Sequence, residues 1–198
     1  MTPPPVVILA GGASRRMGGR DKALVMLAGR PLLAHVIDRM APQCEAMALN
    51  SNGDAADYAA FGLPVLPDTI PDRPGPLAGV MAAMDWAAAA GHAHVVTVTA
   101  DTPFLPGDLV PQLLLRASSA PVLAESGGRL HPVVGLWPVD LRAALSEALL
   151  SGTRRVTDWT RAMGATALPF PDTDPDLFFN MNTPEDLARA ETLLEGAR

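Results

Sequence analysis

Cysteine is almost absent from this sequence of 198 residues: Cys44 stands alone, which excludes a disulfide bond within the chain. No Cys and His residues have zinc-site spacing, no apolar run approaches the roughly 18 residues of a membrane-spanning helix, and Met1–Pro5 lacks the charged start of a signal peptide. The net charge of −6 argues against binding duplex nucleic acid through a broad basic face. We therefore expect a cytoplasmic protein without membrane or nucleic-acid partners.

Lysine is equally scarce, because 14 of the 15 cationic residues are arginine and only Lys22 is lysine. Composition alone favours chance retention of this lysine, and the alternative is a position that needs a compact ammonium rather than a planar guanidinium. Aromatic residues make up only 5 % of the chain, whereas alanine, with 33 residues, is the commonest type. A hydrophobic content of 48 % is ample for a packed core of small aliphatic side chains, and the length corresponds to one domain.

Apolar runs of strand length alternate with longer helical patterns, which predicts an α/β domain with a mostly parallel sheet. In the first half, the pattern predicts strands over 6–10, 45–50, 64–66 and 94–100, and helices over 31–40, 55–61 and 77–90. In the second half it predicts an antiparallel hairpin of 121–125 and 131–137 around Gly127–Gly128, helices over 141–150 and 155–163, an extended piece over 178–181, and a helix capped by Thr183. The sheet is therefore expected to be mixed.

Residues 11–22, directly after the first predicted strand, have the composition of an anion-binding loop. Four glycines, three arginines and Lys22 fall within these twelve residues. Glycines at the carboxyl end of a strand let the backbone approach a ligand and turn several N–H groups toward an anion. Neither a Walker A pattern nor Gly-x-Gly-x-x-Gly is present. The loop therefore predicts phosphate binding of a kind other than the kinase-type and dinucleotide classes, and it favours this over a turn with solvated arginines. A phosphate-binding role would also explain why the single lysine stands at position 22.

Asp101 ends the 94–100 strand, at the position where open α/β sheets bind ligands. One carboxylate together with phosphate oxygens is a common way to hold Mg²⁺. Alone, such an aspartate would as often cap a helix or a turn. Beside a phosphate-type loop, it predicts a magnesium site.

Six further positions stay open between ligand contact and a structural role. Asn50 and Asp68 end predicted strands on one edge, and each could bond a base or ribose or form a turn. The Arg154–Arg155 pair suits a phosphate or another acidic substrate, but it equally suits a solvated helix face. Asn180 and Asn182 precede a capped helix, so capping competes with ligand contact.

Together, these motifs resemble the molybdenum cofactor guanylyltransferases. The resemblance covers residues 6–195 and runs in order through Leu9–Gly12, Arg15–Gly19, Asp21–Lys22, Asp68, Pro74–Gly79, Asp101–Pro103, His131–Pro132, Arg154–Arg155 and Asn180–Glu185. The loop alone would indicate only the wider nucleotidyltransferase group, whereas the combination is specific. The resemblance implies a Rossmann-like nucleotide-diphospho-sugar transferase fold, a three-layer α/β/α arrangement with a mostly parallel mixed sheet, formed as a single nucleotidyltransferase domain over residues 1–198.

The resemblance also implies a reaction, in which GTP and molybdenum-bound molybdopterin give the guanine dinucleotide form of the cofactor and pyrophosphate. It assigns GTP binding to Leu9, Ala10, Gly11, Gly12, Lys22, Asn50 (or Asn52), Asp68 and Asp101. The expected catalytic residues are Arg16, Lys22 and Asp101, with Asp101 also holding Mg²⁺. The residues expected to contact molybdopterin are Arg154, Arg155, Asn180 and Asn182. Molybdenum-insertion proteins and recipient molybdoenzymes are expected as further partners.

Three alternatives differ in substrate or in class: a molybdenum cofactor cytidylyltransferase that uses CTP, a sugar-1-phosphate nucleotidyltransferase, and a catalytically silent nucleotide or cofactor carrier. Retention of the loop, Lys22 and Asp101 together argues against the silent carrier. Gly11 favours guanine, because pyrimidine-using relatives resemble Leu-Ala-Ala-Gly here and a Cβ at this position would crowd a purine.

Overall fold

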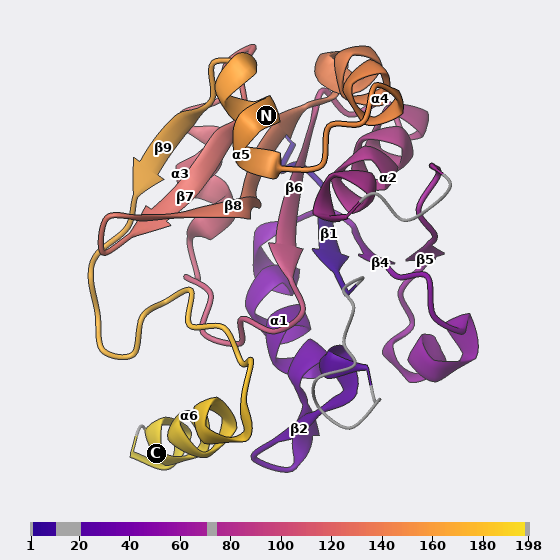
Figure 1. The fold of residues 1–198 in the computed structure, drawn as a ribbon. Coiled ribbons are helices and arrows are strands. Elements are labelled where there is room, and N and C mark those ends of the chain that lie inside the picture. The colour runs from indigo at the N-terminus through magenta and orange to yellow at the C-terminus, as the bar shows by residue number, and fades with distance from the viewer. Residues whose placement is uncertain (1, 11–20, 71–74, 197–198) are drawn as a thin grey trace.

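A seven-stranded sheet runs through the computed structural model, which describes residues 2–10, 21–70 and 75–196 (Figure 1). Its order, β5-β4-β1-β6-β8-β7-β9, joins β5 (Val65–Leu66), β4 (Met47–Asn50), β1 (Val6–Leu9), β6 (His94–Thr99), β8 (Arg129–Pro138), β7 (Val122–Ser126) and β9 (Thr166–Pro169). Only β8 runs against the other strands of this sheet. The predicted mixed, mostly parallel sheet is therefore confirmed, and the carboxyl ends of six strands meet at one edge.

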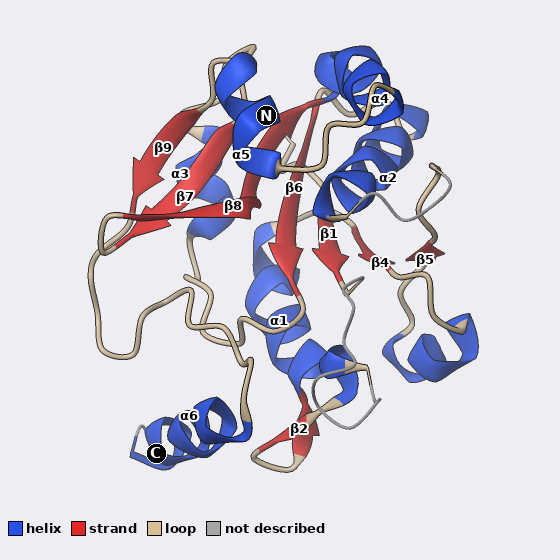
Figure 2. Cartoon of the chain, in the orientation of Figure 1, coloured by secondary structure: helices blue, strands red, loops and turns tan. Residues whose placement is uncertain are grey.

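Helices cover both faces of the sheet, as Figure 2 shows. One face carries α2 (Pro76–Ala89), α4 (Arg142–Leu150) and α5 (Val156–Ala162), and the other carries α1 (Leu32–Met40) and α3 (Leu109–Leu114). Alternation along β1 explains the two cores, because Val6 and Ile8 belong to the α1 and α3 side whereas Val7 and Leu9 belong to the α2 side. The predicted three-layer α/β/α arrangement is confirmed.

The C-terminal helix α6 (Pro184–Gly196) packs below the carboxyl edge against the hairpin of β2 (Met26–Leu27) and β3 (Arg30–Pro31). Thr183 caps it as predicted, since its Oγ1 accepts the N–H of Asp186 at 3.1 Å. In return, Asp186 Oδ2 accepts the N–H groups of Asn182 and Thr183, each at 2.9 Å. Burial raises the pKa of Asp186, but these hydrogen bonds outweigh it and hold that pKa below the ordinary value. The cap fixes residues 180–183 where α6 begins.

The boundaries of the elements agree with the sequence in most places, and the elements that differ lie in both halves of the chain. Residues 178–181 are not extended: the N–H groups of Phe178 and Phe179 turn back to Asp176, and that of Met181 bonds Asp101 O. The last strand is β9 instead, a short edge strand that the sequence did not predict, and α3 and the β2–β3 hairpin were also missed. Within the described residues, no helix is long and apolar enough to cross a membrane.

Candidate active site at the carboxyl edge of the sheet

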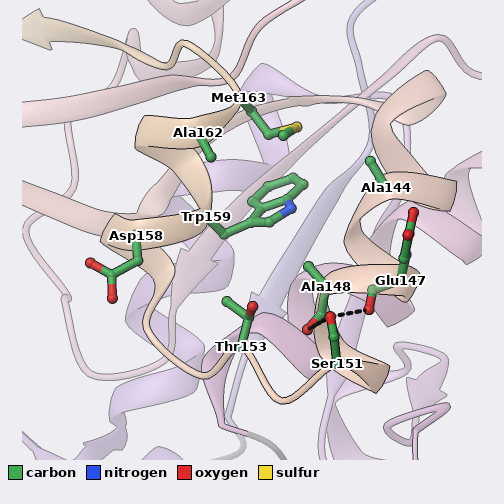
Figure 3. Close-up of a pocket in the computed structure, with 9 residues that line it drawn as sticks. All are labelled: Ala144, Glu147, Ala148, Ser151, Thr153, Asp158, Trp159, Ala162 and Met163. Carbon is green, nitrogen blue, oxygen red and sulfur yellow. Dashed lines mark hydrogen bonds between the residues drawn. The ribbon is translucent and has the colours of Figure 1, made fainter.

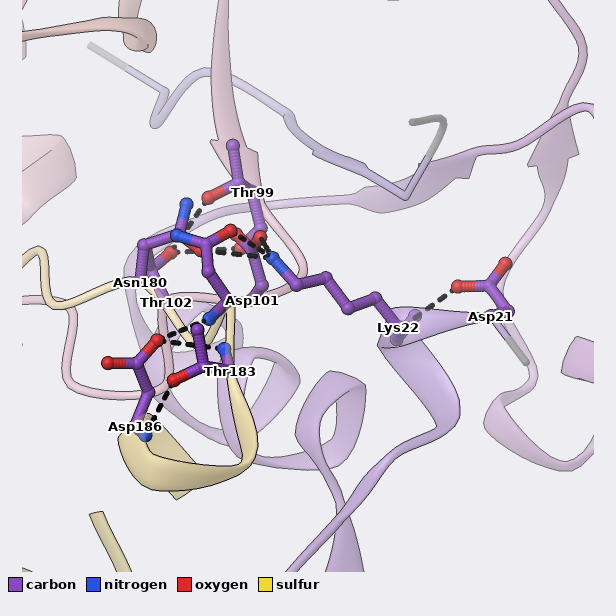
Figure 4. Close-up of polar contacts among 10 residues, drawn as sticks. Asp21, Lys22, Thr99, Asp101, Thr102, Asn180, Thr183 and Asp186 are labelled. Carbon is purple, nitrogen blue, oxygen red and sulfur yellow. Dashed lines mark hydrogen bonds and ion pairs between the residues drawn. The ribbon is translucent and has the colours of Figure 1, made fainter. Parts of the chain in front are cut away.

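The side chain of Lys22 is held among three oxygen atoms at the carboxyl edge (Figure 4). Lys22 begins a short 3₁₀ turn, η1 (Lys22–Leu24), and its Nζ donates to Asp101 Oδ2 and Asn182 Oδ1, both at 2.6 Å, and to Asn180 Oδ1 at 3.2 Å. An ammonium group carries three rotatable N–H donors and suits such a cluster, whereas a guanidinium presents a flat fork. The structure thus brings four predicted site residues together from three distant segments.

Asp101 follows β6 and is only half satisfied. Its Oδ2 pairs with Lys22, whereas its Oδ1 is buried and has no hydrogen-bond partner in the described parts of the chain. The turn behind it is fixed by Thr102, whose Oγ1 donates to Thr99 O at 2.9 Å. A buried carboxylate oxygen without a donor calls for a cation or another ligand. This oxygen is the observation that fits Mg²⁺ at Asp101.

The surrounding donors also fit a hard cation. The side chains of Asn180 and Asn182 turn their amide oxygens toward the same ammonium group as Asp101. Mg²⁺ prefers oxygen ligands and usually keeps waters and substrate phosphates in its shell. Among the described residues, no three carboxylate, imidazole or thiol groups gather as a ready-made metal site. A magnesium ion at Asp101 would therefore need amide, water or phosphate oxygens as further ligands.

Asn50 and Asp68 form a second group, on the β4–β5 side of the edge. Asn50 is 2 % exposed, and its Nδ2 donates to Leu66 O and to Asp68 Oδ1, each at 3.0 Å. The exposed Asn52 donates to the other oxygen of Asp68 at 2.7 Å and accepts the Asp68 N–H at 2.9 Å. Both carboxylate oxygens of Asp68 thus have donors. Within this group Asn50 is buried, whereas Asn52 is exposed to solvent.

The end of β1 adjoins this second group. The Ala10 N–H donates to Asn50 O at 2.9 Å, and Leu9 ends the strand almost fully buried. Gly79 of α2 faces them at close range: a Cβ there would lie 2.4 Å from Asn50 Oδ1 and 3.1 Å from Leu9 Cδ2. The structure therefore brings Leu9, Ala10, Asn50 and Asp68 together. Three other predicted site residues, Gly11, Gly12 and Arg16, lie outside the described residues.

Arg154 and Arg155 form a third, separate location between α4 and α5. Both are exposed, and Arg154 Nη1 donates to Leu149 O at 3.0 Å and Thr153 O at 3.1 Å, so the guanidinium caps the end of α4. The backbone here adjoins the start of α2, because a Cβ on Gly75 would lie 3.9 Å from Arg154 O. In the described structure, no hydrogen bond or ion pair joins this pair to the Lys22 cluster. That cluster consists of Lys22, Asp101, Asn180 and Asn182.

A cavity of about 370 Å³ lies between α4 and α5, and Thr153, the residue before this pair, is part of its lining (Figure 3). Its floor is apolar and includes Trp159, whose indole Nε1 is buried without a hydrogen-bond partner in the described residues. Glu147 of α4 and Asp158 of α5 are also among the residues that line it. None of the predicted site residues in the described parts of the chain lines this cavity.

A further network, which the sequence did not reveal, anchors the loop that carries Asn180 and Asn182. Ser126 Oγ donates to Asp176 Oδ1 at 2.9 Å and lies 2.8 Å from His131 Nε2. Since the serine has one proton and gives it to the carboxylate, His131 Nε2 is the donor to Ser126. The His131 ring also stacks on Phe178 with centroids 4.4 Å apart. His131, which belongs to one of the segments that carry the family resemblance, thus has hydrogen-bond and stacking partners within the fold.

Comparison with known proteins agrees with the family resemblance seen in the sequence. Residues 6–166 match the family model of the MobA-like NTP transferase domain. A molybdenum cofactor guanylyltransferase of Cereibacter sphaeroides is 52 % identical over 188 residues, which cover 95 % of each chain. Its counterpart in Bradyrhizobium sp. (strain ORS 278) is 51 % identical over 195 residues, covering 96 % of this chain and 92 % of the relative.

A solved structure extends the agreement to the fold. Molybdopterin-guanine dinucleotide biosynthesis protein A from Archaeoglobus fulgidus superimposes with a TM-score of 0.74 at 22 % identity, covering 97 % of this chain and 99 % of the other. The nucleotidyltransferase fold expected from the sequence is confirmed. The chain belongs to the molybdenum cofactor guanylyltransferase family, within the MobA-like nucleotidyltransferases.

Proposed function

We propose that the chain, acting in the cytoplasm as a single domain over residues 1–198, transfers the guanylyl group of GTP to molybdenum-bound molybdopterin. The observation that carries the proposal is the Lys22 cluster, in which an ammonium and a half-satisfied carboxylate lie 2.6 Å apart at the ligand-binding edge. An oxygen of the molybdopterin phosphate attacks the α-phosphorus of GTP and forms a new P–O–P bridge. The bond to the β-phosphate breaks, and pyrophosphate leaves.

The chemistry needs positioning and charge neutralisation more than it needs a general base, because a phosphate monoester is already ionised near neutral pH. In the proposal, Lys22 donates to the phosphate oxygens on which negative charge develops, and Arg16 is a second cation on the same loop. Asp101 would hold Mg²⁺, with the oxygens of Asn180 and Asn182 beside it. When bound, the ion supplies positive charge against the triphosphate.

The proposal assigns the two substrates to different residues. The guanine nucleotide is placed on the side of Asn50 and Asp68, where β1 and β4 end. Gly11 and Gly12, in the loop that follows β1, are proposed to line the same side. Molybdopterin is proposed to meet Arg154 and Arg155, which are exposed cations suited to its acidic groups. Asn180 and Asn182 stay proposed contacts to molybdopterin, and they are bonded to Lys22, the group proposed to contact the reacting phosphates.

The test is a comparison of four nucleotides with one acceptor. Purified protein receives Mg²⁺, molybdate-loaded molybdopterin and GTP, CTP, ATP or UTP at equal concentration, and both pyrophosphate and the dinucleotide product are measured. Product from GTP alone supports the proposal, which the names of the relatives also favour. Equal transfer from CTP would point to a cytidylyltransferase. Binding of GTP by calorimetry without any pyrophosphate would point to a silent carrier.

A further inference from the structure

Tyr58, the single tyrosine of the chain, is hydrogen-bonded to Asp21, the residue before Lys22. It lies in the 3₁₀ segment η3 (Ala55–Phe61), is 2 % exposed, and donates its hydroxyl hydrogen to Asp21 Oδ2. The other oxygen, Asp21 Oδ1, accepts the Ala23 N–H at 2.8 Å and so caps the turn from which Lys22 extends. One carboxylate thus joins Tyr58 to the turn of Lys22.

The hydrogen bonds behind Tyr58 run in a single direction. A carboxylate only accepts, so the one proton of Tyr58 belongs to its bond with Asp21. Ser51 Oγ, 3.0 Å from the Tyr58 oxygen, must then donate to it, and Ser51 Oγ in turn accepts the Gly53 N–H at 3.0 Å. Burial, and next the hydrogen bond to Asp21, raise the pKa of Tyr58 to about 12, which keeps the hydroxyl protonated at neutral pH. This series of hydrogen bonds starts just after β4, on the side proposed to bind the nucleotide, and ends at Asp21.

We propose that Tyr58 is a positioning residue for Lys22, acting through Asp21. Asp21 holds two donors at once, and losing the buried one frees its carboxylate to rotate away from the Ala23 N–H. The turn then loosens, and the Lys22 side chain no longer has one preferred direction toward Asp101, to which its Nζ is bonded at 2.6 Å. Tyr58 thereby connects the end of β4 to the reacting centre. This inference rests on the proposed function, because it presumes that Lys22 neutralises charge in guanylyl transfer.

The first test is Tyr58→Phe, which removes only the hydroxyl. Turnover should fall roughly three- to tenfold while the KM for GTP stays within about twofold, because a misdirected Lys22 weakens the transition state more than the ground state. In a Lys22→Ala background, the same substitution should change turnover by less than about twofold, since the group it positions is gone. Equal slowing in both backgrounds would overturn the inference and leave Tyr58 with a merely structural role.

The second test needs no activity and uses the single lysine as a reporter. Protein grown with ¹³C-labelled lysine gives one Cε–Hε signal, that of Lys22. Tyr58→Phe should move this signal toward the position of free lysine and speed amide exchange at Ala23. The control is Thr160→Val, which removes a buried hydroxyl on α5, away from the Lys22 cluster, and should leave the signal unchanged.

The two tests separate two kinds of failure. An unchanged Lys22 signal in Tyr58→Phe overturns the inference whatever the enzyme does. If the wild-type chain releases no pyrophosphate with any nucleotide, the proposed function fails, while the lysine signal still decides whether Tyr58 directs Lys22.

Discussion

Two groups of polar side chains lie along the carboxyl edge of the sheet, and they are assembled in different ways. Asp68 and its two asparagine partners, Asn50 and Asn52, come from segments 16 and 18 residues apart. Lys22 instead joins partners that are 79, 158 and 160 residues away in sequence. The first group is local and the second is built from the whole chain.

The groups also differ in what they leave unsatisfied. Each carboxylate oxygen of Asp68 has an N–H donor, so this group is complete by itself and shapes a surface. Asp101, by contrast, keeps one buried oxygen without a partner in the described structure, beside a fixed positive charge. Unpaired buried polar atoms are rare in folded proteins and gather where a ligand completes them. We therefore propose that the group of Asp68, Asn50 and Asn52 recognises the nucleotide. The Lys22 cluster is then proposed to carry out the guanylyl transfer.

The largest effect is expected from Asp101→Asn, which keeps the shape of the side chain but removes the charge that we propose holds Mg²⁺. Pyrophosphate release should fall roughly 10²- to 10³-fold, while GTP affinity measured by calorimetry should stay similar. The matched control is Asp68→Asn in the complete group, where the loss should be smaller and should fall on the KM for GTP. Normal turnover of Asp101→Asn across a magnesium titration would mean that Asp101 is structural.

Lys22→Ala should reduce turnover roughly ten- to a hundredfold, because one charge-assisted contact to phosphate is lost. Lys22→Arg should restore little of it, since a flat guanidinium does not match oxygens arranged around a point charge. The melting temperature of Lys22→Ala should fall, and that of Lys22→Arg should fall less, because the largely buried lysine is the ion-pair partner of Asp101. Turnover within about twofold of the wild type would contradict the role of Lys22.

The group of Asp68, Asn50 and Asn52, and the strands that position it, could be predicted from the sequence. Buried runs ending at Leu9, Asn50 and Thr99 are short and bounded by turn residues, and parallel strands end at one edge, so their polar neighbours must approach each other. Asp101 was predicted on the same ground. Pattern and proximity in sequence were sufficient here.

The long-range group could be predicted only in part. Nothing local places Asn180 and Asn182 against Lys22, because their position depends on the Thr183 cap and on Met181 bonding Asp101 O. The segment before them looks extended by residue type, yet Asp176 gathers its N–H groups into a turn. The role of Tyr58 was missed for the same reason. The available signals were weak: one tyrosine, one lysine, and an aspartate directly before that lysine.

Gly79→Ala should disturb the local group without touching the Lys22 cluster. The added Cβ would lie 2.4 Å from Asn50 Oδ1, so Asn50 must shift and the nucleotide side must repack. We expect a loss of about 1–3 kcal/mol in the free energy of unfolding and a higher KM for GTP. Gly107→Ala is the control, because nothing lies within 4 Å of a Cβ there. An unchanged denaturation midpoint and KM would show that Asn50 is free to move.

The smallest expected effect is on the pH dependence of stability. It concerns the network of Ser126, His131 and Asp176, which anchors the loop that carries Asn180 and Asn182. Burial lowers the pKa of His131 below its ordinary value of 6.5, against the charge of Asp176, which raises it. The unfolded chain therefore takes up a proton more readily than the folded one below about pH 6.5. The stability that the neutral ring contributes is complete above that pH and is lost as the pH falls through the lowered pKa.

His131→Gln tests this, because the glutamine amide can still donate to Ser126 but does not titrate. Chemical denaturation from about pH 7 to about pH 5 should show a shallower loss of stability in the variant than in the wild type. The other histidines are present in both proteins, so the difference between the two slopes isolates His131. Equal slopes would mean that the proton on His131 does not distinguish the folded from the unfolded chain. A shallower slope together with unchanged turnover near neutral pH would show that the network holds the loop of Asn180 and Asn182 through its hydrogen bonds and not through its charge.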